Sequence, residues 1–156
     1  MHSQKIKRIV TCVLLVGYIL TGITDALLHG KRSFSSIMGI DINRVYFYTF
    51  ILLTIGSWLL YNKWFVGIGF LALASFSSYF KEFIFLHNYF ASVIIYIGIL
   101  LDIITRKKYK WLFPMIICGV IQGLAFQTYF LGGYAVLCME ALGLCLGSIF
   151  ILITIK

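Results

Sequence analysis

The chain has 156 residues, of which 62% are hydrophobic, 12% are charged and one is proline; this leaves too little polar surface to cover the core of a soluble domain of this size. The apolar residues come in long runs rather than in stripes, which indicates an integral membrane protein. The formal net charge of +8 does not indicate nucleic-acid binding, because the basic residues cluster at the ends of apolar runs, where membrane proteins carry topology signals.

The first apolar run covers residues 9–28. This is long enough for a spanning helix, which needs about 20 apolar residues. Basic residues precede the run, as they do in a signal peptide, but the apolar region of a cleaved signal has only about 7–15 residues. We therefore expect an uncleaved first span.

The next run, residues 45–80, is too long for one helix. At 1.5 Å per residue it would measure roughly 54 Å, against a hydrocarbon core of about 30 Å. Asn62 and Lys63 lie near its middle between two aromatic residues, which predicts a tight polar turn at the membrane interface. Gly132-Gly133 divides the last apolar stretch in the same way. The predicted spans cover residues 9–28, 45–61, 64–80, 89–105, 111–129 and 134–155.

The fold class expected from these runs is an all-α, polytopic bundle of six transmembrane helices without a soluble domain. Five helices are the alternative, if residues 45–80 form one tilted helix and an interfacial piece. Basic clusters before the first span and at residues 106–110 are separated by four spans, so both lie on one side, which the positive-inside rule assigns to the cytoplasm. We expect a multi-pass protein of the plasma membrane with both termini cytoplasmic. The longest loop, residues 29–44, then lies outside, on the bilayer surface or dipping back as a cap.

Polar residues within or beside the apolar runs concentrate in the outer half of this topology. A charged side chain at membrane depth is costly, by about 2.5–3.5 kcal/mol for an aspartate at a helix centre, and such residues commonly mark a substrate, ion or proton site. The alternative for each residue is a structural hydrogen bond between helices. The candidate ligand-binding or proton-linked residues are Asp25, His29, Glu82, His87, Gln127 and Glu140.

Small residues indicate which helix faces pack. Gly17, Thr21 and Asp25 recur every fourth residue, and small residues at this spacing let helix backbones approach closely in lipid. In the last two spans, glycines share faces with Gln127 and Glu140, which predicts that these polar side chains point into the bundle. The predicted helix-packing residues are Gly119, Gly123, Gly143 and Gly147.

Two other acids have local explanations. Asp102 lies at the end of the fourth span beside Arg106, which predicts an ion pair with the basic turn. Asp41 precedes the second span near Arg44, and we expect it to be a loop charge that caps the start of that helix. Neither acid is a candidate for the outer pocket.

A pocket with two carboxylates and one or two imidazoles suits three tasks: binding a cationic or hydrogen-bonding small molecule, carrying protons, or holding a metal. The first two lead to the main expectation, a small membrane protein that binds or translocates a small molecule or ion through an outer-half polar pocket. Six short spans, cytoplasmic termini and no soluble domain resemble, in architecture alone, the substrate-binding subunits of energy-coupling-factor vitamin importers.

Two other interpretations remain open. One is a non-catalytic transmembrane subunit of a larger complex, such as an oxidoreductase, permease or secretion machine, whose polar residues contact partner subunits or a second copy. The other is a small intramembrane metalloenzyme that uses Asp25, His29, His87 and Glu140, although one D-x-x-x-H pattern carries little information. No pattern indicates nucleophilic catalysis, and the sequence predicts neither a particular metal nor a cofactor.

Overall fold

The computed structural model describes residues 2–34, 36–77, 79–89, 94–128 and 134–155, with the side chains of residues 2–3, 88–89 and 125–128 outside the description. These ranges are built from helices and contain no strand, which confirms the all-α prediction. The helices are α1 (His2–Leu28), α2 (Ile42–Leu60), α3 (Trp64–Ser75), α4 (Ile84–Tyr89), α5 (Ile95–Thr105), α6 (Leu112–Thr128) and α7 (Ala135–Thr154), with short 3-10 turns η1 (Lys81–Phe83) and η3 (Tyr109–Trp111).

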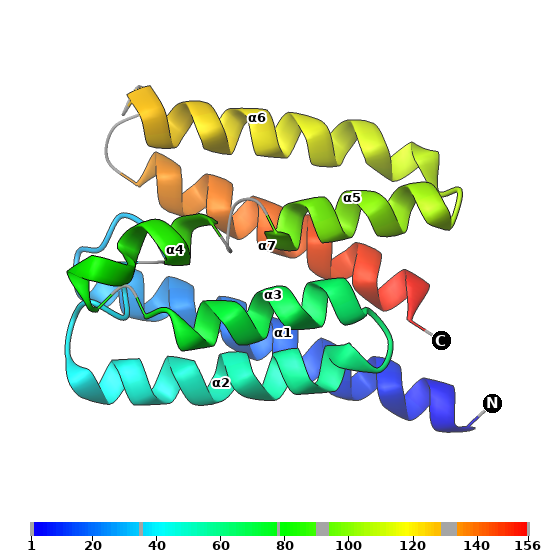
Figure 1. Ribbon diagram of the computed structural model, residues 1–156, viewed down its shortest axis with the longest axis horizontal. Coiled ribbons are helices and arrows are strands. Elements are labelled where there is room, and N and C mark those ends of the chain that lie inside the picture. The colour runs from blue at the N-terminus through cyan, green and yellow to red at the C-terminus, as the bar shows by residue number, and fades with distance from the viewer. Residues whose placement is uncertain (1, 35, 78, 90–93, 129–133, 156) are drawn as a thin grey trace.

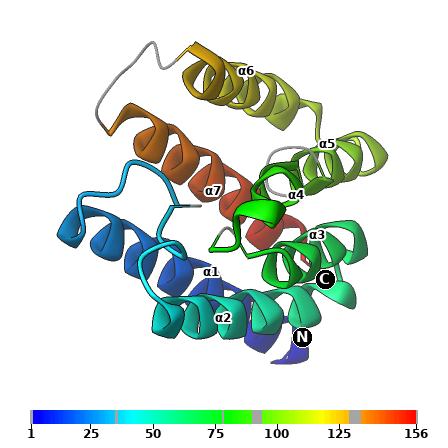
Figure 2. The same cartoon turned by 60° about the vertical axis from the view of Figure 1, so that its left-hand side comes forward.

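The longer helices run along the molecule as hairpins (Figure 1). Helix α2 turns back into α3, and α5 turns back into α6 at the same end of the molecule, where both chain termini also lie. We call this the terminal end. The loop between α1 and α2 and the short helix α4 lie at the opposite end, which we call the cap end. Figure 2 shows α7 between the layer of α1 and α2 and the layer of α5 and α6.

Two helical segments are long and apolar enough to cross a membrane, by length and composition: Gln4–Leu28 in α1 and Ala135–Thr154, which is α7. Helices α3 and α5 are shorter, with 12 and 11 residues. At 1.5 Å per residue each is roughly 17–18 Å long, less than the hydrocarbon core of about 30 Å. Helix α3 ends five residues before the predicted limit at residue 80, and α5 begins six residues after the predicted start at residue 89.

Serine side chains explain the early end of α3. The Ser75 hydroxyl donates to the carbonyl oxygen of Leu71 at 3.0 Å, and the Ser77 hydroxyl accepts from the backbone N–H of Tyr79 at 3.2 Å. Such local side-chain bonds compete with helical ones. Phe76, with φ −110° and ψ 76°, leaves the helical conformation. The chain therefore turns across the cap end, where η1 and α4 follow.

Asp41 caps α2, as the sequence predicts. Its carboxylate accepts from the backbone N–H of Arg44 at 2.9 Å, which satisfies a backbone donor that the first turn of a helix leaves free. This hydrogen bond, together with the nearby Arg44 guanidinium, lowers the pKa of Asp41 below its ordinary value.

Helices α2 and α3 approach each other backbone to backbone, a contact that was not among the predicted glycine contacts. A Cβ atom on Gly67 would lie 2.7 Å from the backbone nitrogen of Leu60 and 2.9 Å from the carbonyl oxygen of Gly56. The two backbones pack this closely because both positions lack a side chain. Three of the four predicted glycines lie near another helix. An added Cβ atom would lie 2.7 Å from the Tyr96 ring at Gly119, 3.0 Å from Ile99 at Gly147 and 3.7 Å from Gln122 at Gly143. At Gly123 the added Cβ atom would face open space within the described chain.

Candidate functional site

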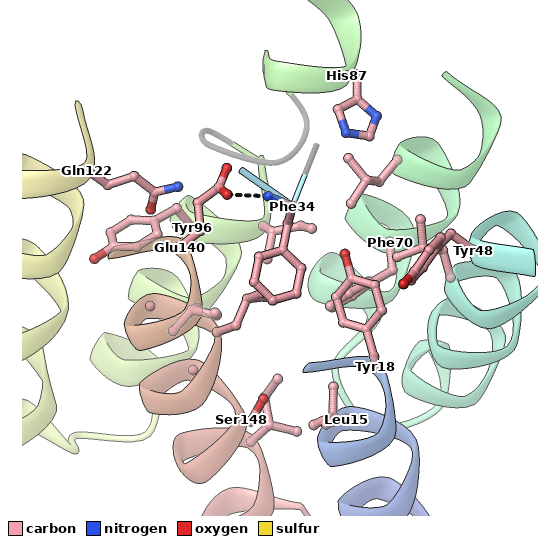
Figure 3. A pocket seen from close by; sticks show the side chains of 18 of the residues that line it. Leu15, Tyr18, Phe34, Tyr48, Phe70, His87, Tyr96, Gln122, Glu140 and Ser148 are labelled. Atoms are coloured by element: carbon pink, nitrogen blue, oxygen red, sulfur yellow. Dashed lines mark hydrogen bonds between the residues drawn. The ribbon is translucent and has the colours of Figure 1, made fainter. Parts of the chain in front are cut away.

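A cavity of about 100 Å³ lies inside the bundle, towards the cap end (Figure 3). Thirteen of its twenty lining residues carry no polar side-chain atom, so the cavity is largely apolar rather than the polar pocket that the sequence suggested. It is lined by Leu15 and Tyr18 of α1, Phe34, Ile37 and Met38 of the loop, Tyr48 and Leu52 of α2, Phe70 and Leu73 of α3, His87 of α4, Ile95, Tyr96 and Ile99 of α5, Gln122 of α6, and Glu140, Gly143, Leu144, Gly147, Ser148 and Ile151 of α7.

Glu140 supplies the carboxylate of this cavity. It lies in the second turn of α7 and is 8% exposed. Its Oε2 accepts a hydrogen bond of 2.6 Å from the backbone N–H of Phe34, 106 positions away in the chain (Figure 3). No lysine or arginine lines the cavity, and Glu140 forms no salt bridge within the described residues. An ionised carboxylate here has no cation to offset its desolvation.

The loop between α1 and α2 lines one side of the cavity and packs into the bundle, as expected for a cap. Phe34, Ile37 and Met38 of this loop are 8%, 1% and 3% exposed. The Phe34 ring packs on Tyr18, with 5.8 Å between the ring centroids. A Cβ atom on Gly22 would overlap this ring, so the glycine makes room for the loop against α1.

Short-range hydrogen bonds shape the cap loop. The Ser36 hydroxyl donates to the carbonyl oxygen of Ser33 at 2.7 Å, and the Ser36 backbone N–H donates to the Ser33 hydroxyl at 3.2 Å. The backbone N–H of Ile37 donates to the carbonyl oxygen of Phe34 at 3.1 Å. These turns satisfy polar backbone groups locally, which allows the apolar side chains of the loop to enter the bundle.

His87 also lines the cavity, beneath α4 (Figure 3). It is 3% exposed, and its Nδ1 lies 2.7 Å from the carbonyl oxygen of Phe76. A carbonyl oxygen can only accept, so Nδ1 carries the proton in this bond. Burial lowers the pKa of His87 below its ordinary value, and the imidazole is therefore neutral near pH 7.

Tyr96 and Gln122 complete the polar part of the lining, and the sequence analysis selected neither. Tyr96 of α5 and Gln122 of α6 both line this cavity (Figure 3). The Tyr96 hydroxyl is buried next to Gly119 of α6, whose Cβ position lies 3.1 Å from the hydroxyl oxygen. Gln122 lies between Gly119 and Gly123, and the sequence analysis selected only these two glycines, as helix-packing residues.

Asp25 and His29 belong to a separate cluster. The Asp25 carboxylate accepts from Arg44 Nε at 3.2 Å and from the Tyr48 hydroxyl at 2.9 Å. His29 Nδ1 donates to the carbonyl oxygen of Asp25 at 2.9 Å, and its Nε2 accepts from Arg44 Nη2 at 3.1 Å. Neither Asp25 nor His29 lines the cavity. Arg44, which also pairs with Asp41, is the centre of this group.

The structure thus divides the predicted site residues. Glu140 and His87 line one cavity, and Asp25 and His29 surround Arg44. Glu82 is exposed on η1 and does not line the cavity. Gln127 is in α6, but its side chain lies outside the described residues.

A third polar cluster lies at the terminal end. Asp102 pairs with Arg106 at 2.8 Å, as predicted. Lys63, which sequence analysis assigned only to a turn, is 4% exposed, and its Nζ donates to Asp102 and, at 2.7 Å, to the Thr154 hydroxyl. Nζ also lies 5.4 Å from the centre of the Phe150 ring. Burial lowers the pKa of Lys63, while Asp102 opposes this shift. The cluster joins the ends of α3, α5 and α7.

The metalloenzyme interpretation required Asp25, His29, His87 and Glu140 to share a site. The positive Arg44 guanidinium lies against Asp25 and His29, while the other two residues line the cavity. In the part of the chain that is described, no three His, Cys, Asp or Glu side chains gather as a metal site would require. The residues present do not fit this hypothesis.

Comparison with protein-family models, curated proteins and solved structures finds no match to this chain. The chemistry of the site is therefore the basis for a functional assignment. An apolar cavity with a few polar groups is the usual form of a small-molecule site. In this cavity the polar groups are one carboxylate, one imidazole, one amide, one serine hydroxyl and the phenols of three tyrosines.

Proposed function

We propose that this protein is a small multi-pass membrane protein that binds, or carries across the membrane, a small molecule with an apolar body and a cationic head. The observation that carries the proposal is Glu140, a carboxylate in a largely apolar cavity without a lysine or arginine beside it. An ammonium group would supply the missing cation, and the apolar wall would hold the rest of the ligand.

The surface of the bundle supports a membrane environment. Large apolar side chains point outward from several helices, including Val13 of α1, Phe50 of α2, and Phe113 and Val120 of α6, which are 56–72% exposed. A soluble monomer rarely exposes apolar surface on this scale, whereas lipid chains would cover it. Support for six spans comes from the alternating directions of the helices in Figure 1, and from the basic turn at residues 106–110 lying at the same end as both termini.

The size of the cavity restricts the ligand. An engineered cavity of about 150 Å³ binds benzene, so a cavity of about 100 Å³ holds a molecule somewhat smaller than benzene. A larger ligand would have to displace the cap loop, whose Phe34 backbone N–H is held by the same Glu140 carboxylate. Short alkylammonium ions fit both the volume and the charge.

The test is ligand-induced thermal stabilisation of the purified protein in detergent, with short alkylamines and with alcohols of the same shape. We expect the amines to raise the unfolding temperature, and Glu140→Gln to weaken their binding about 10- to 100-fold, because a hydrogen bond to a charged group contributes about 1.5–3 kcal/mol. Asp25→Asn is the matched control: it removes a carboxylate outside the cavity and should retain amine binding.

Three results would contradict the proposal. Equal amine binding by Glu140→Gln and the wild type would show that Glu140 is not the anchor. Loss of binding in Asp25→Asn alone would transfer the site to the Arg44 cluster. If no amine stabilises the wild type, the non-catalytic subunit of a larger complex becomes the better interpretation.

A further inference from the structure

A second hollow opens at the terminal end, remote from the capped cavity. It is a cleft of about 470 Å³, which is within the size range of small-molecule sites. Three segments far apart in the sequence form it: the start of α1, the turn between α5 and α6, and the end of α7. It shares no lining residue with the capped cavity. It is lined by Gln4, Arg8, Thr105, Arg106, Lys108, Ile153, Thr154 and Ile155.

The cleft is strongly basic. Arg8, Arg106 and Lys108 line it, and no acidic residue does. Arg106 is engaged, because its Nε donates to Asp102 at 2.8 Å and its Nη1 donates to the carbonyl oxygen of Thr154 at 3.1 Å. Arg8 and Lys108 form no salt bridge within the described chain. Two cations without a salt bridge in the described residues thus line one cleft, which favours binding of an anion.

The backbone holds the basic turn in place. The N–H of Lys107 donates to the carbonyl oxygen of Ile104 at 3.0 Å, and that of Lys108 donates to Ile103 at 2.9 Å. Lys107 adopts the left-handed conformation, with φ 55°. Together these features are a Schellman motif, which ends α5. Arg106 and Lys108 therefore flank a fixed turn, and the cleft is formed before a ligand arrives.

Apolar side chains adjoin the charges. Ile153 lines the cleft and is 51% exposed, and Ile9 of α1 and Ile104 of α5, both close in sequence to lining residues, are 53% and 46% exposed. A site with cations in the cleft and exposed apolar helix faces around it matches an anionic headgroup carried on acyl chains. Basic pockets between helices at the cytoplasmic face of membranes bind such headgroups.

We propose that this cleft binds the phosphate group of an anionic phospholipid, with Arg8 and Lys108 as the main cationic contacts. Guanidinium groups match phosphate oxygens in geometry, and lysine adds a point charge. The proposal rests on the membrane placement proposed above and is independent of the ligand in the capped cavity.

The experiment measures thermal stabilisation of the full chain in detergent by phosphatidylglycerol, by zwitterionic phosphatidylcholine and by inorganic phosphate. The test variant is Arg8→Gln/Lys108→Gln. The matched control is Lys5→Gln/Lys110→Gln, which removes the same charge from exposed residues of the same segments that do not line the cleft. Phosphatidylglycerol should stabilise the wild type and the control. The test variant should bind it about 25-fold more weakly, at about fivefold for each of the two basic side chains.

Equal weakening in both double variants would mean a diffuse charge effect and would overturn the site. So would equal stabilisation by phosphatidylcholine. Stabilisation by inorganic phosphate without any effect of phosphatidylglycerol would assign the cleft to a soluble phosphate compound and contradict the lipid proposal. Amine binding in the capped cavity should survive the Arg8→Gln/Lys108→Gln change, so failure of one proposal is distinguishable from failure of the other.

Discussion

At the scale of single residues, Asp25 and Glu140 show how two acids with the same sequence signature acquire different surroundings. Asp25 lies at the end of α1 beside the start of α2, where Arg44 and Tyr48 bind it. Among the described residues, Glu140 accepts a hydrogen bond from the Phe34 backbone N–H and otherwise faces the cavity. The ion pair with Arg44 thus offsets the desolvation cost of Asp25 in the first apolar run. Glu140 has no such cationic partner among the described residues.

His87 provides the first prediction. Its pKa is lowered by burial, so between that lowered value and the ordinary one of about 6.5 the unfolded chain binds more protons than the folded protein. The contribution of His87 to the free energy of unfolding is therefore fully present above about pH 6.5 and is lost as the pH falls through this window. His87→Gln, which keeps a neutral donor for Phe76, should remove this dependence.

The measurement is the difference in unfolding temperature between wild type and His87→Gln, from roughly pH 8 to roughly pH 5, a range that brackets the ordinary histidine pKa. The wild type should lose stability relative to the variant on acidification. A difference between wild type and His87→Gln that is constant with pH would show that the imidazole does not titrate in this range.

At the scale of elements, the cap loop depends on one side chain and one glycine. Phe34 packs on Tyr18, and its ring occupies the space beside Gly22 of α1. The loop therefore joins α1 to α7 through the ring contact on one side and the Glu140 hydrogen bond on the other. This double attachment holds the loop against the cavity.

Gly22→Ala should disturb this attachment. The added methyl group would overlap the buried Phe34 ring, and overpacking of this kind costs about 1–3 kcal/mol. Gly17→Ala is the matched control in the same helix, because nothing lies within 4 Å of its Cβ position. It should gain up to about 1 kcal/mol from helix propensity. Thermal unfolding in detergent compares the two, and equal stability would mean that the ring is not held against α1.

At the scale of the whole molecule, the bundle has two chemically distinct ends. The terminal end carries the Lys63 cluster and the basic cleft. The cap end carries the Arg44 cluster, the loop and the capped cavity. In the proposed orientation, which follows the positive-inside rule, the terminal end would lie in the cytoplasm and the capped cavity would face the outer side.

Cysteine labelling tests this orientation, in a variant whose four native cysteines are replaced by serine. Arg32→Cys, at the cap end, should react with an impermeant maleimide added to intact cells. Lys107→Cys, in the basic turn, should react only after the cells are permeabilised. Labelling of position 107 alone from outside would reverse the proposed orientation. Labelling of both positions from outside would contradict the three predicted spans between them, because an odd number of spans places the two positions on opposite sides.

The sequence alone determined those features that depend on short stretches of chain. Apolar run lengths predict helices, and the polar pair Asn62-Lys63 predicts the turn that separates α2 from α3. The Asp41 cap and the Asp102–Arg106 pair join residues three and four positions apart, so local spacing is sufficient to find them.

Only the tertiary structure decided which polar residues meet. Phe34 is 106 positions from Glu140, and Lys63 is 91 positions from Thr154. Helical periodicity gives the face of a residue within its own helix, but the neighbour opposite that face depends on how each helix is rotated and shifted in the bundle. Packing of the whole bundle fixes these rotations. The cavity at Glu140 and the ion pair at Asp25 are therefore properties of the assembled fold, even though both acids are evident in the sequence.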